Sequence, residues 1–441
     1  MEESYLKQAR ECLAFIEKSV SCFHAVENMG IQLKEKGFKE LREQDAWALE
    51  PGKGYFVTRN ASSLIAFQIP KASSRENPFG EAAGFHITAS HSDSPGFKVK
   101  PEPEILAENS YVKLNVEPYG GMIHASWLDR CLSAAGKIVF KKGDTLASKT
   151  VNIDEDLLVI PNLAIHMNHE MNKSLAYDPQ VDLQPLFCGE WDKDEQETCK
   201  GILEKKIAQA AGIEEEALLG RDIFLYVREK GKLAGARKEL MVSPRLDDLE
   251  CVFASLKAFL MSKPERYVSV CAVFDNEEVG SHTRQGAAST FLKDTLERIG
   301  EGMGRQGSSY LRMLSDSFMI SADNAHALHP CHPEKADPSN RPRLNRGIVI
   351  KYHGGQKYTT DAYSEAVIKS LCQQAKVPCQ TYCNRSGTVG GSTLGNISSA
   401  QVSIPTADAG LAQLAMHSAV ETAGSRDVEY LIRMLKVFYE K

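Results

Sequence analysis

Short, almost wholly apolar segments alternate with helical apolar patterns in the second half of this chain, and this alternation constrains the fold most strongly. Residues 267–274 read YVSVCAVF, a run whose length and β-branched content are typical of a buried strand. Phe318–Ser321 is a second such segment, and the apolar residues of Leu249–Phe259 recur at helical spacing. Strands that alternate with helices in this way predict an α/β sheet covered by helices on both faces.

The first half of the chain adds elements of both kinds. Near the N-terminus we predict helices over Leu6–Ile16 and around Val26–Leu33, and strands over Tyr55–Thr58, Ser63–Gln68 and Phe85–Ser90. From about Ser94 the pattern becomes rich in β segments, with an acidic helical insert around Glu190–Gly212; the segments are Tyr111–Glu117, Lys137–Lys141 and Ile223–Arg228. A chain of 441 residues exceeds one ordinary core. We therefore expect a discontinuous α/β domain of residues 1–93 and 241–441, with a β-rich domain of residues 94–240 inserted.

Charge and cysteine usage exclude several classes of protein. The net charge is −6, which gives the chain no electrostatic reason to bind nucleic acid or an anionic membrane. Its apolar runs are strand-sized and too short to span a bilayer. The N-terminus has an amphipathic helical pattern rather than that of a signal peptide, and the eleven cysteines include no CxxC pair. Free thiols in a reducing compartment follow, and we expect a cytoplasmic protein.

Histidines and acidic residues gather where the predicted strands end. The groups are His91-Ser92-Asp93, Asp247-Asp248, Glu277-Glu278 and Asp323, and His417 lies near the C-terminus. In open α/β sheets ligands bind beyond the carboxyl ends of the strands, and imidazole and carboxylate are zinc ligands. Two zinc ions about 3.5–4 Å apart share a carboxylate, and one of two adjacent glutamates can serve as a general base. The combination predicts a metal cluster.

Each group taken alone also has a structural interpretation. Asp247-Asp248 follows Ser243-Pro244 and could supply the N-cap and first-turn carboxylates of a helix. Glu277-Glu278 is harder to explain in this way, because two like charges directly after a buried strand repel one another unless a cation is near.

Other metal or phosphate motifs are not expected. His326, His329 and His332 mimic a metal triad, but Pro330 and Pro333 forbid a regular helix across them. The chain contains neither HExxH nor GxxxxGK. The glycine-rich run Gly387–Gly395 is therefore predicted to be a tight loop that lines a pocket.

Short motifs spread along nearly the whole chain complete the pattern. They are SCFHAV from Ser21, GYFVTRN from Gly54, HSDSPGFKVKP from His91, WLDRCLSAAGK from Trp127, LAIHMN from Leu163, RLDDLE from Arg245, FDNEEVGSHTRQGA from Phe274, SADNAHALHP from Ser321, GGSTLG from Gly390 and LAMHSAVET from Leu414. In this order they resemble the M18 metallopeptidases, the family of aspartyl aminopeptidase and vacuolar aminopeptidase I. The resemblance implies a zinc-peptidase α/β/α domain with an inserted dimerisation domain, and dimers that assemble into a hollow tetrahedral dodecamer.

The resemblance also implies a site with two zinc ions. By position Asp247 matches the carboxylate that bridges both ions. His91 and Asp323 would complete one zinc site, and Glu278 and His417 the other.

Further roles follow from the same resemblance. Glu277 matches the general base, and Asp93 the residue that orients the imidazole of the first zinc site. His166 resembles a histidine that reaches into the active site of a neighbouring subunit, and His326 one that lines the substrate pocket; the alternative for both is a surface or packing histidine. Lys351 lies in a segment similar to the family's specificity region, where a cation would favour acidic first residues; an ordinary surface lysine is the alternative.

The expected function is hydrolysis of the N-terminal peptide bond of peptides by a metal-dependent aminopeptidase. Another co-catalytic zinc hydrolase, such as a carboxypeptidase or deacylase, and a non-catalytic scaffold are the alternatives. The ligand set also accepts cobalt or manganese. Gly387, Ala409 and Ala412 depart from residues common in the family, which leaves the preferred first residue open.

Overall fold

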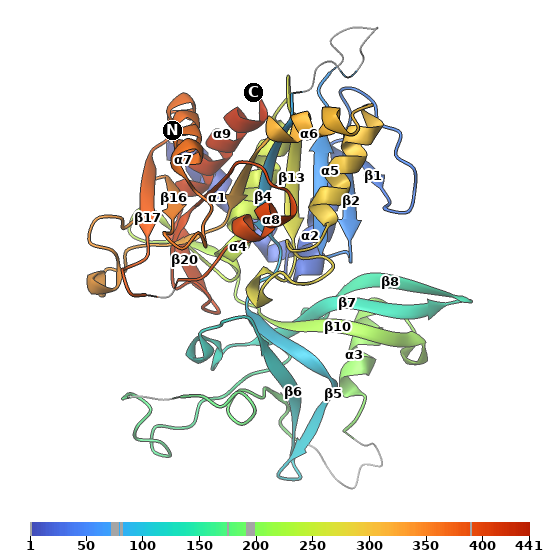
Figure 1. Ribbon diagram of the computed structural model, residues 1–441. Helices are drawn as coiled ribbons and strands as arrows, with labels where there is room; N and C mark the ends of the chain where they lie inside the picture. Colours follow the sequence, from blue (N-terminus) through green and yellow to red (C-terminus); the bar gives the residue numbers. More distant parts are fainter. Residues whose placement is uncertain (1, 72–78, 80–82, 174–175, 191–198, 389) are drawn as a thin grey trace. The chain divides into compact units, whose positions relative to one another are not determined.

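The computed structural model describes residues 2–71, 79, 83–173, 176–190, 199–388 and 390–441. The described chain divides into two compact units (Figure 1). The larger comprises Met1–Asp93, Gly231–Met416 and Glu421–Lys441, and the smaller comprises Ser94–Lys230 and the short return segment His417–Val420. The expected domain boundaries at 93/94 and 240/241 stay a prediction. The compact units instead divide at 230/231, and the smaller unit also includes the return segment.

A nine-stranded mixed sheet organises the larger unit. In spatial order its strands are β1 (Lys39–Leu41), β2 (Gly54–Arg59), β3 (Ser63–Gln68), β13 (Val268–Phe274), β4 (Phe85–His91), β14 (Phe318–Ala322), β18 (Thr406–Gly410), β16 (Ile348–Tyr352) and β17 (Cys379–Cys383). The central strands β13, β4, β14 and β18 run parallel to one another, whereas β3 is antiparallel to both of its neighbours. The carboxyl ends of four neighbouring strands therefore lie at one edge.

Helices cover both faces of this sheet because its strands are buried on both sides. Along β3, Leu64 and Ala66 contribute to one hydrophobic core, and Ile65 and Phe67 contribute to the other, as the alternation of side chains along a strand requires. On the first core pack α1 (Glu2–Lys18), α2 (Cys22–Glu35), α4 (Leu246–Met261), α7 (Ala362–Ala375) and α9 (Asp427–Tyr439). On the second pack α5 (Phe291–Gly302), α6 (Ser308–Ser315) and α8 (Leu394–Gln401). The predicted α/β/α architecture is confirmed.

Local sequence signals explain where several elements begin. The Ser21 side chain accepts a hydrogen bond from the backbone of His24 and caps α2, and Asp361 with Ser364 forms a capping box at the start of α7. The predicted strands at 55–58, 63–68, 85–90, 267–274 and 318–321 are confirmed as β2, β3, β4, β13 and β14.

A second, five-stranded sheet completes the larger unit. Its order is β11 (Lys232–Ala234), β12 (Leu240–Ser243), β20 (Glu421–Gly424), β19 (Ala412–Leu414) and β15 (Ala325–His326). These strands are short, and β12 leads directly into α4. The sheet therefore connects the start of α4 with the C-terminal part of the chain, a link that the local patterns did not predict.

The smaller unit is built on a six-stranded antiparallel sheet. Its order is β8 (Thr145–Asn152), β7 (Leu132–Lys142), β10 (Leu218–Val227), β5 (Gly96–Ala107), β6 (Tyr111–Tyr119) and β9 (Leu186–Cys188). Leu203 and Ile207 of α3 (Ile202–Ala211) belong to the hydrophobic core of this unit. The helical insert predicted at 190–212 is confirmed only as α3, and residues 191–198 lie outside the described part of the chain. The β-rich character predicted for this segment is confirmed.

All eleven cysteines are free thiols, as predicted. Among the described residues, no helix is long and apolar enough to cross a membrane.

One thiol pair has an unusual acidity. Cys372, in the last turn of α7, donates a hydrogen bond to Cys379, which lowers the pKa of the exposed Cys379 thiol to about 6, and Lys369 acts in the same direction. Since the thiolate is the reactive form, alkylation of Cys379 by iodoacetamide should reach half its maximal rate near that pH, rather than near the ordinary cysteine pKa of about 8.5. Peptide mapping after timed alkylation measures this. In Cys372→Ala the midpoint should rise, and an unchanged midpoint would contradict the assignment.

Candidate metal centre

Three of the predicted groups meet at the edge of the sheet where parallel strands end. His91 is the last residue of β4, Asp323 directly follows β14, and Glu277 lies three residues beyond β13. Because β13, β4 and β14 are neighbours and run parallel, their carboxyl ends lie side by side. This is the position at which open α/β sheets bind ligands.

The fourth group comes from the start of α4. Asp247 and Asp248 are 3% and 0% exposed, their φ and ψ angles are not helical, and the peptide bond between them is cis. The N-cap position is occupied by Arg245, which makes no side-chain capping bond. Neither aspartate is therefore the N-cap, so that part of the structural alternative is wrong, whereas both do lie in the first turn of α4. Asp247 and Asp248 also lie close to His91.

Distances within the larger unit define the cluster. His91 Nε2 lies 3.6 Å from Asp247 Oδ1 and 4.0 Å from Asp323 Oδ1. One ligand atom from each of His91, Asp248 and Asp323 lies within 4.8 Å of the other two, and the same holds for His91, Glu277 and Glu278. One imidazole surrounded by carboxylates is a donor set that suits zinc, so the residues fit the metal that the resemblance implies.

The hydrogen bonds of His91 leave one ring nitrogen for a metal. Its Nδ1–H donates to the backbone carbonyl of Asp93 at 3.0 Å, and the Asp93 carboxylate lies 3.4 Å from the same nitrogen. Nε2 therefore faces the other carboxylates, and once deprotonated it would offer its lone pair to a metal, as in zinc-binding histidines whose other nitrogen is held by an oxygen. The backbone N–H of His91 donates to Asp248 Oδ2 at 3.2 Å.

The Asp93 carboxylate also holds the backbone of the turn after β13, a contact that the sequence did not indicate. Its two carboxylate oxygens accept hydrogen bonds from the backbone N–H groups of Glu277, at 3.1 Å, and Glu278, at 3.2 Å. Asp93 thus joins the end of β4 to the turn that follows β13. Its contact with His91 is chiefly through its backbone carbonyl.

The electrostatics of the cluster are those of a site built around a cation. Burial is the largest cause that raises the pKa of Glu277 to about 8 and raises that of Asp323, and neighbouring carboxylates add to both. The carboxylates Asp247 and Asp93 raise the pKa of His91 well above its usual range, against the opposing effect of burial. Crowded carboxylates of this kind hold protons when no metal compensates their charge.

Zinc binding to this centre should consequently release protons. Zinc requires neutral imidazole and ionised carboxylates, so the protons held by His91 and the acids must leave as the ion enters. The apparent affinity should therefore rise with pH, by about tenfold per pH unit for each proton released. Titration of the metal-free protein with zinc against a chelator at pH 6 and pH 8, with a pH indicator to count protons, measures the effect. Equal affinities at the two pH values would contradict it.

Lys351 is buried beside the cluster. It is 2% exposed, and its Nζ lies 3.2 Å from Asp323 Oδ2 and donates to the carbonyl of Asn324 at 3.1 Å. Burial lowers the pKa of Lys351, but nearby acidic groups, Asp323 foremost, outweigh this and raise it. The alternative of an ordinary surface lysine is therefore wrong. His326, in β15, is exposed, with its ring centroid 6.1 Å from that of Tyr382.

Two predicted site residues belong to the smaller unit. His166 is exposed in a turn. His417 opens the return segment, and its Nδ1–H donates to the carbonyl of Gly121 at 3.1 Å. This bond occupies Nδ1 of His417, so Nε2 is the nitrogen that a metal would bind. Whether His417 and His166 join the cluster stays a prediction.

Gly395, the last residue of the predicted glycine loop, lies in α8 rather than in a loop. A Cβ added to Gly395 would lie 2.7 Å from Oδ1 of Asp408, so only glycine fits there. Residue 389 of the predicted loop lies outside the described residues.

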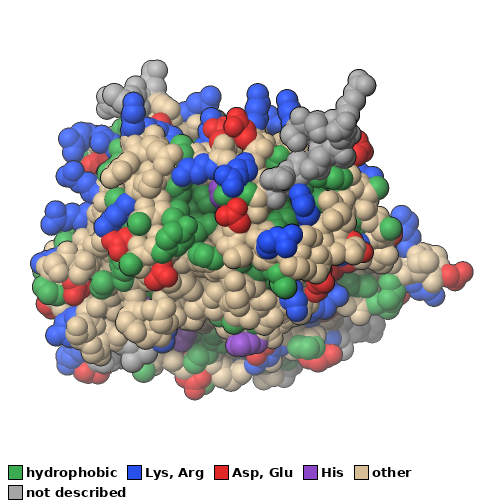
Figure 2. Space-filling model, turned by 45° about the horizontal axis from the view of Figure 1, so that its top comes forward, with side chains coloured by type: hydrophobic (Ala, Val, Ile, Leu, Met, Phe, Trp, Pro, Cys, Tyr) green, Lys and Arg blue, Asp and Glu red, His purple; other side chains and the backbone are tan. Residues whose placement is uncertain are grey.

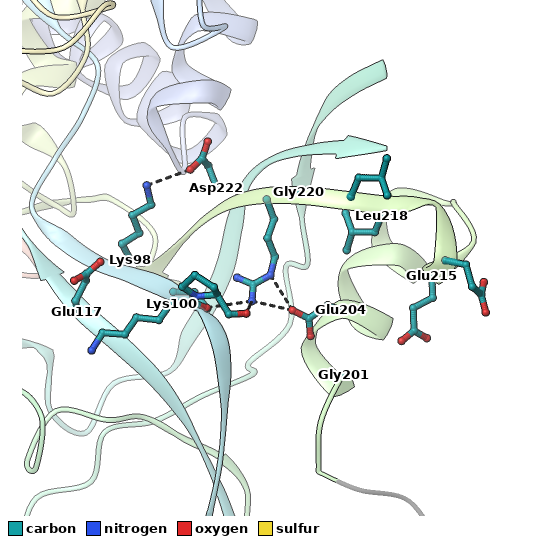
Figure 3. A pocket seen from close by; sticks show the side chains of 14 residues that line it. Lys98, Lys100, Glu117, Gly201, Glu204, Glu215, Leu218, Gly220 and Asp222 are labelled. Carbon is teal, nitrogen blue, oxygen red and sulfur yellow. Dashed lines mark hydrogen bonds and ion pairs between the residues drawn. The ribbon is translucent and has the colours of Figure 1, made fainter. Parts of the chain in front are cut away.

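The groove drawn in Figure 3 belongs to the smaller unit, and its lining differs from that of the acidic cluster around His91. Its volume is about 770 Å³, and it is lined by ion-paired side chains such as Lys98 with Asp222 at 3.1 Å and Arg221 with Glu204 at 2.8 Å. None of the predicted site residues lines it. It is therefore not a candidate for the catalytic site.

Comparison with known proteins identifies the family. A family model described as aminopeptidase I zinc metalloprotease (M18) matches residues 15–439. The chain belongs to the M18 family. Among M18 relatives, the probable M18 family aminopeptidase 2 of Clostridium novyi is 43% identical over 436 residues, which cover 98% of this chain and 99% of the relative. That of Clostridium acetobutylicum is 44% identical over the same length, with the same coverage. M18 membership makes this chain a zinc-dependent aminopeptidase.

Solved structures of M18 proteins agree in fold. A chain in a cryo-EM structure of the Ape4 and Nbr1 complex has a TM-score of 0.94 at 35% identity, and the match covers 100% of this chain and 86% of that one. A crystal structure of prApe1 has a TM-score of 0.92 at 27% identity, with coverages of 100% and 96%. A structure of mApe1 from S. cerevisiae, described as a dodecamer, has a TM-score of 0.83 at 27% identity, with coverages of 99% and 97%.

Three buried residues behind the cluster are not indicated by the sequence motifs, nor is a separate role for Asp248. Asn324, Gln413 and Glu421 are buried polar residues that hydrogen-bond to one another. A signal was present for two of them, because Asn324 directly follows Asp323 and Glu421 lies four residues after His417.

Proposed function

We propose that this M18 protein hydrolyses the N-terminal peptide bond of peptides at a centre of two zinc ions, with Glu277 as the general base. The observation that supports it most is the convergence of His91, Asp247 or Asp248, Glu277-Glu278 and Asp323 at the carboxyl ends of three parallel strands. A scaffold protein would have no need to keep this many like charges buried together.

The ligand roles are assigned as follows. His91 and Asp323 would hold one ion, Glu278 and His417 would hold the other, and Asp247 would supply a carboxylate to both. Asp248, whose carboxylate accepts from the backbone of His91, supports that ligand. Cobalt or manganese would fit the same donors.

The protein groups divide the chemistry between them. When bound, the zinc ions lower the pKa of a water molecule and polarise the substrate carbonyl. Glu277 accepts a proton from the attacking water and returns it to the leaving amine. The backbone N–H groups of Glu277 and Glu278 are both held by Asp93, so the base stays at a fixed place relative to its neighbour. His166 or His326 would donate a hydrogen bond to the oxyanion.

The substrates are peptides with a free N-terminus. Their α-amino group would bind at the second zinc site and at the neighbouring carboxylates, which restricts cleavage to the first peptide bond. Lys351 is the candidate for a preference for Asp or Glu as the first residue. Its ammonium is already paired with Asp323, so an acidic substrate side chain would share that cation.

Self-association is part of the proposal. By analogy with the mApe1 dodecamer, dimers formed through the inserted unit would build a tetrahedral dodecamer, and the exposed His166 would reach a neighbouring subunit.

Neither nucleic acid nor a membrane is expected as a partner. Figure 2 shows basic and acidic side chains interspersed on one face of the molecule. We expect a cytoplasmic protein.

Acetylation of the substrate tests the proposed reaction directly. The zinc-loaded protein should remove the first residue from peptides with a free α-amino group and leave their N-acetylated counterparts uncut, because acetylation removes the charge and the lone pair that bind the second zinc site. Peptide libraries with each first residue, analysed by mass spectrometry, measure both points. Cleavage that is indifferent to acetylation, or release of acetate, would favour a deacylase or another zinc hydrolase; no cleavage at all would favour a scaffold.

A further inference from the structure

A chain of buried polar side chains lies behind Asp247 within the larger unit. Glu421, the first residue of β20, accepts a hydrogen bond from the backbone N–H of Asp247 through Oε2, at 3.0 Å. Its other oxygen accepts from Nε2 of Gln413 at 3.3 Å, and Oε1 of Gln413 accepts from Nδ2 of Asn324 at 2.8 Å. Glu421, Gln413 and Asn324 are 2%, 1% and 3% exposed.

The other end of the chain of hydrogen bonds reaches Asp323. Asn324 follows Asp323 directly, and its carbonyl accepts from Lys351 at 3.1 Å, while Lys351 also pairs with Asp323. The Asn324 side chain donates in addition to the carbonyl of Leu246, the residue before Asp247, at 3.2 Å. The two proposed zinc ligands Asp247 and Asp323 come from α4 and from the end of β14, and this network joins them.

We infer that Glu421 is a positioning residue that, through Gln413 and Asn324, fixes the separation between Asp247 and Asp323 and so shapes the metal centre; this rests on the proposed function. Glu421 accepts from two donors of the network, the backbone N–H of Asp247 and Nε2 of Gln413. A carboxylate can accept at both oxygens, whereas a glutamine of the same shape presents an NH₂ group to one of two donors. In a buried site that mismatch is costly and is relieved by movement of the partners.

If Glu421 had a purely structural role, its replacement would lower the melting temperature and leave the zinc affinity unchanged. A buried network that ties β20 to β19 and α4 also stabilises the fold, so a lower melting temperature alone does not distinguish the two roles. The metal centre itself must be measured.

The test replaces Glu421 with glutamine and measures zinc affinity by competition with a chelator, together with the visible absorption of the cobalt-substituted protein. We expect an affinity about 10–100-fold lower than that of the parent, the usual effect of losing a group that orients a metal ligand, and an altered cobalt spectrum. Gln413→Met, which removes the donor to Glu421, should act in the same direction. Asp427→Asn is the matched control: Asp427 is 0% exposed and accepts from the backbones of Asn345 and Gly347, so its loss should lower the melting temperature and leave both metal readouts unchanged.

Each outcome decides the inference. If Glu421→Gln binds zinc like the parent, or if Asp427→Asn weakens zinc binding equally, the positioning role is overturned while the proposed function stands. If Glu421→Gln does not fold, the metal readouts of Gln413→Met decide. A parent protein that binds no zinc would remove the proposed function, and the inference with it.

Discussion

Replacement of Glu277 by glutamine should lower kcat by about 10²–10⁴-fold, the contribution typical of a general acid–base, while zinc content and melting temperature stay near those of the parent. Glutamine has the shape of glutamate and keeps the backbone hydrogen bond to Asp93, but its amide cannot accept the proton of the attacking water. Because the variant keeps the carbonyl oxygen and all proposed ligands, substrate binding should change little, so KM should move much less than kcat.

The measurement is steady-state cleavage of a chromogenic aminoacyl substrate, with zinc quantified in the same preparation. Glu265→Gln is a suitable control, since Glu265 is exposed in the loop before β13 and lies outside the cluster. A Glu277→Gln enzyme that keeps the parent's kcat would show that another group accepts the proton. A variant that loses zinc as well as activity would instead place Glu277 among the ligands.

The second large effect is expected at Asp247. Asp247→Asn should weaken zinc binding by more than the roughly 10–100-fold that loss of an outer residue causes, and activity should fall with it. A carboxylate that bridges two cations supplies a negative charge to both, and a neutral amide supplies none. Asp248→Asn should have a smaller effect on zinc, because the amide oxygen of asparagine can still accept from the backbone N–H of His91.

Comparison of these two variants separates the roles of adjacent, equally buried carboxylates. Zinc affinity and stoichiometry, measured by equilibrium dialysis with elemental analysis, provide the readout. If Asp248→Asn loses more zinc than Asp247→Asn, Asp248 is the ligand, which its proximity to His91 and Asp323 also allows. Equal and slight losses in both variants would remove the pair from the metal centre altogether.

Local patterns in the sequence were enough to predict the layers of the fold. The run 268–274 is buried along its whole length as β13, as expected for a nearly continuous apolar run, which is typical of a strand covered on both faces. The same patterns placed His91 and Asp323 at strand ends, since charged residues stop an apolar run.

The remaining features depend on which strands are neighbours. His91 and Asp323 lie 232 positions apart in the sequence, and they meet only because β14 pairs parallel with β4. The carboxylate of Asp93 holds the backbone of Glu277 and Glu278, and Glu421 holds that of Asp247. Backbone N–H groups are present in every residue, so no side-chain pattern indicates which acid will accept from them.

The sequence by itself determined the α/β class, the residues at the strand ends and the family to which the chain belongs, because each of these is written in short segments. Only the tertiary structure decided that Lys351 is buried against Asp323, that Asp247-Asp248 turns toward His91 rather than capping α4, and that a hydrogen-bonded network joins two proposed ligands. The physical reason is that burial and hydrogen-bond partners of polar groups are set by contacts between segments far apart in the chain, and these contacts exist only after the strands have paired.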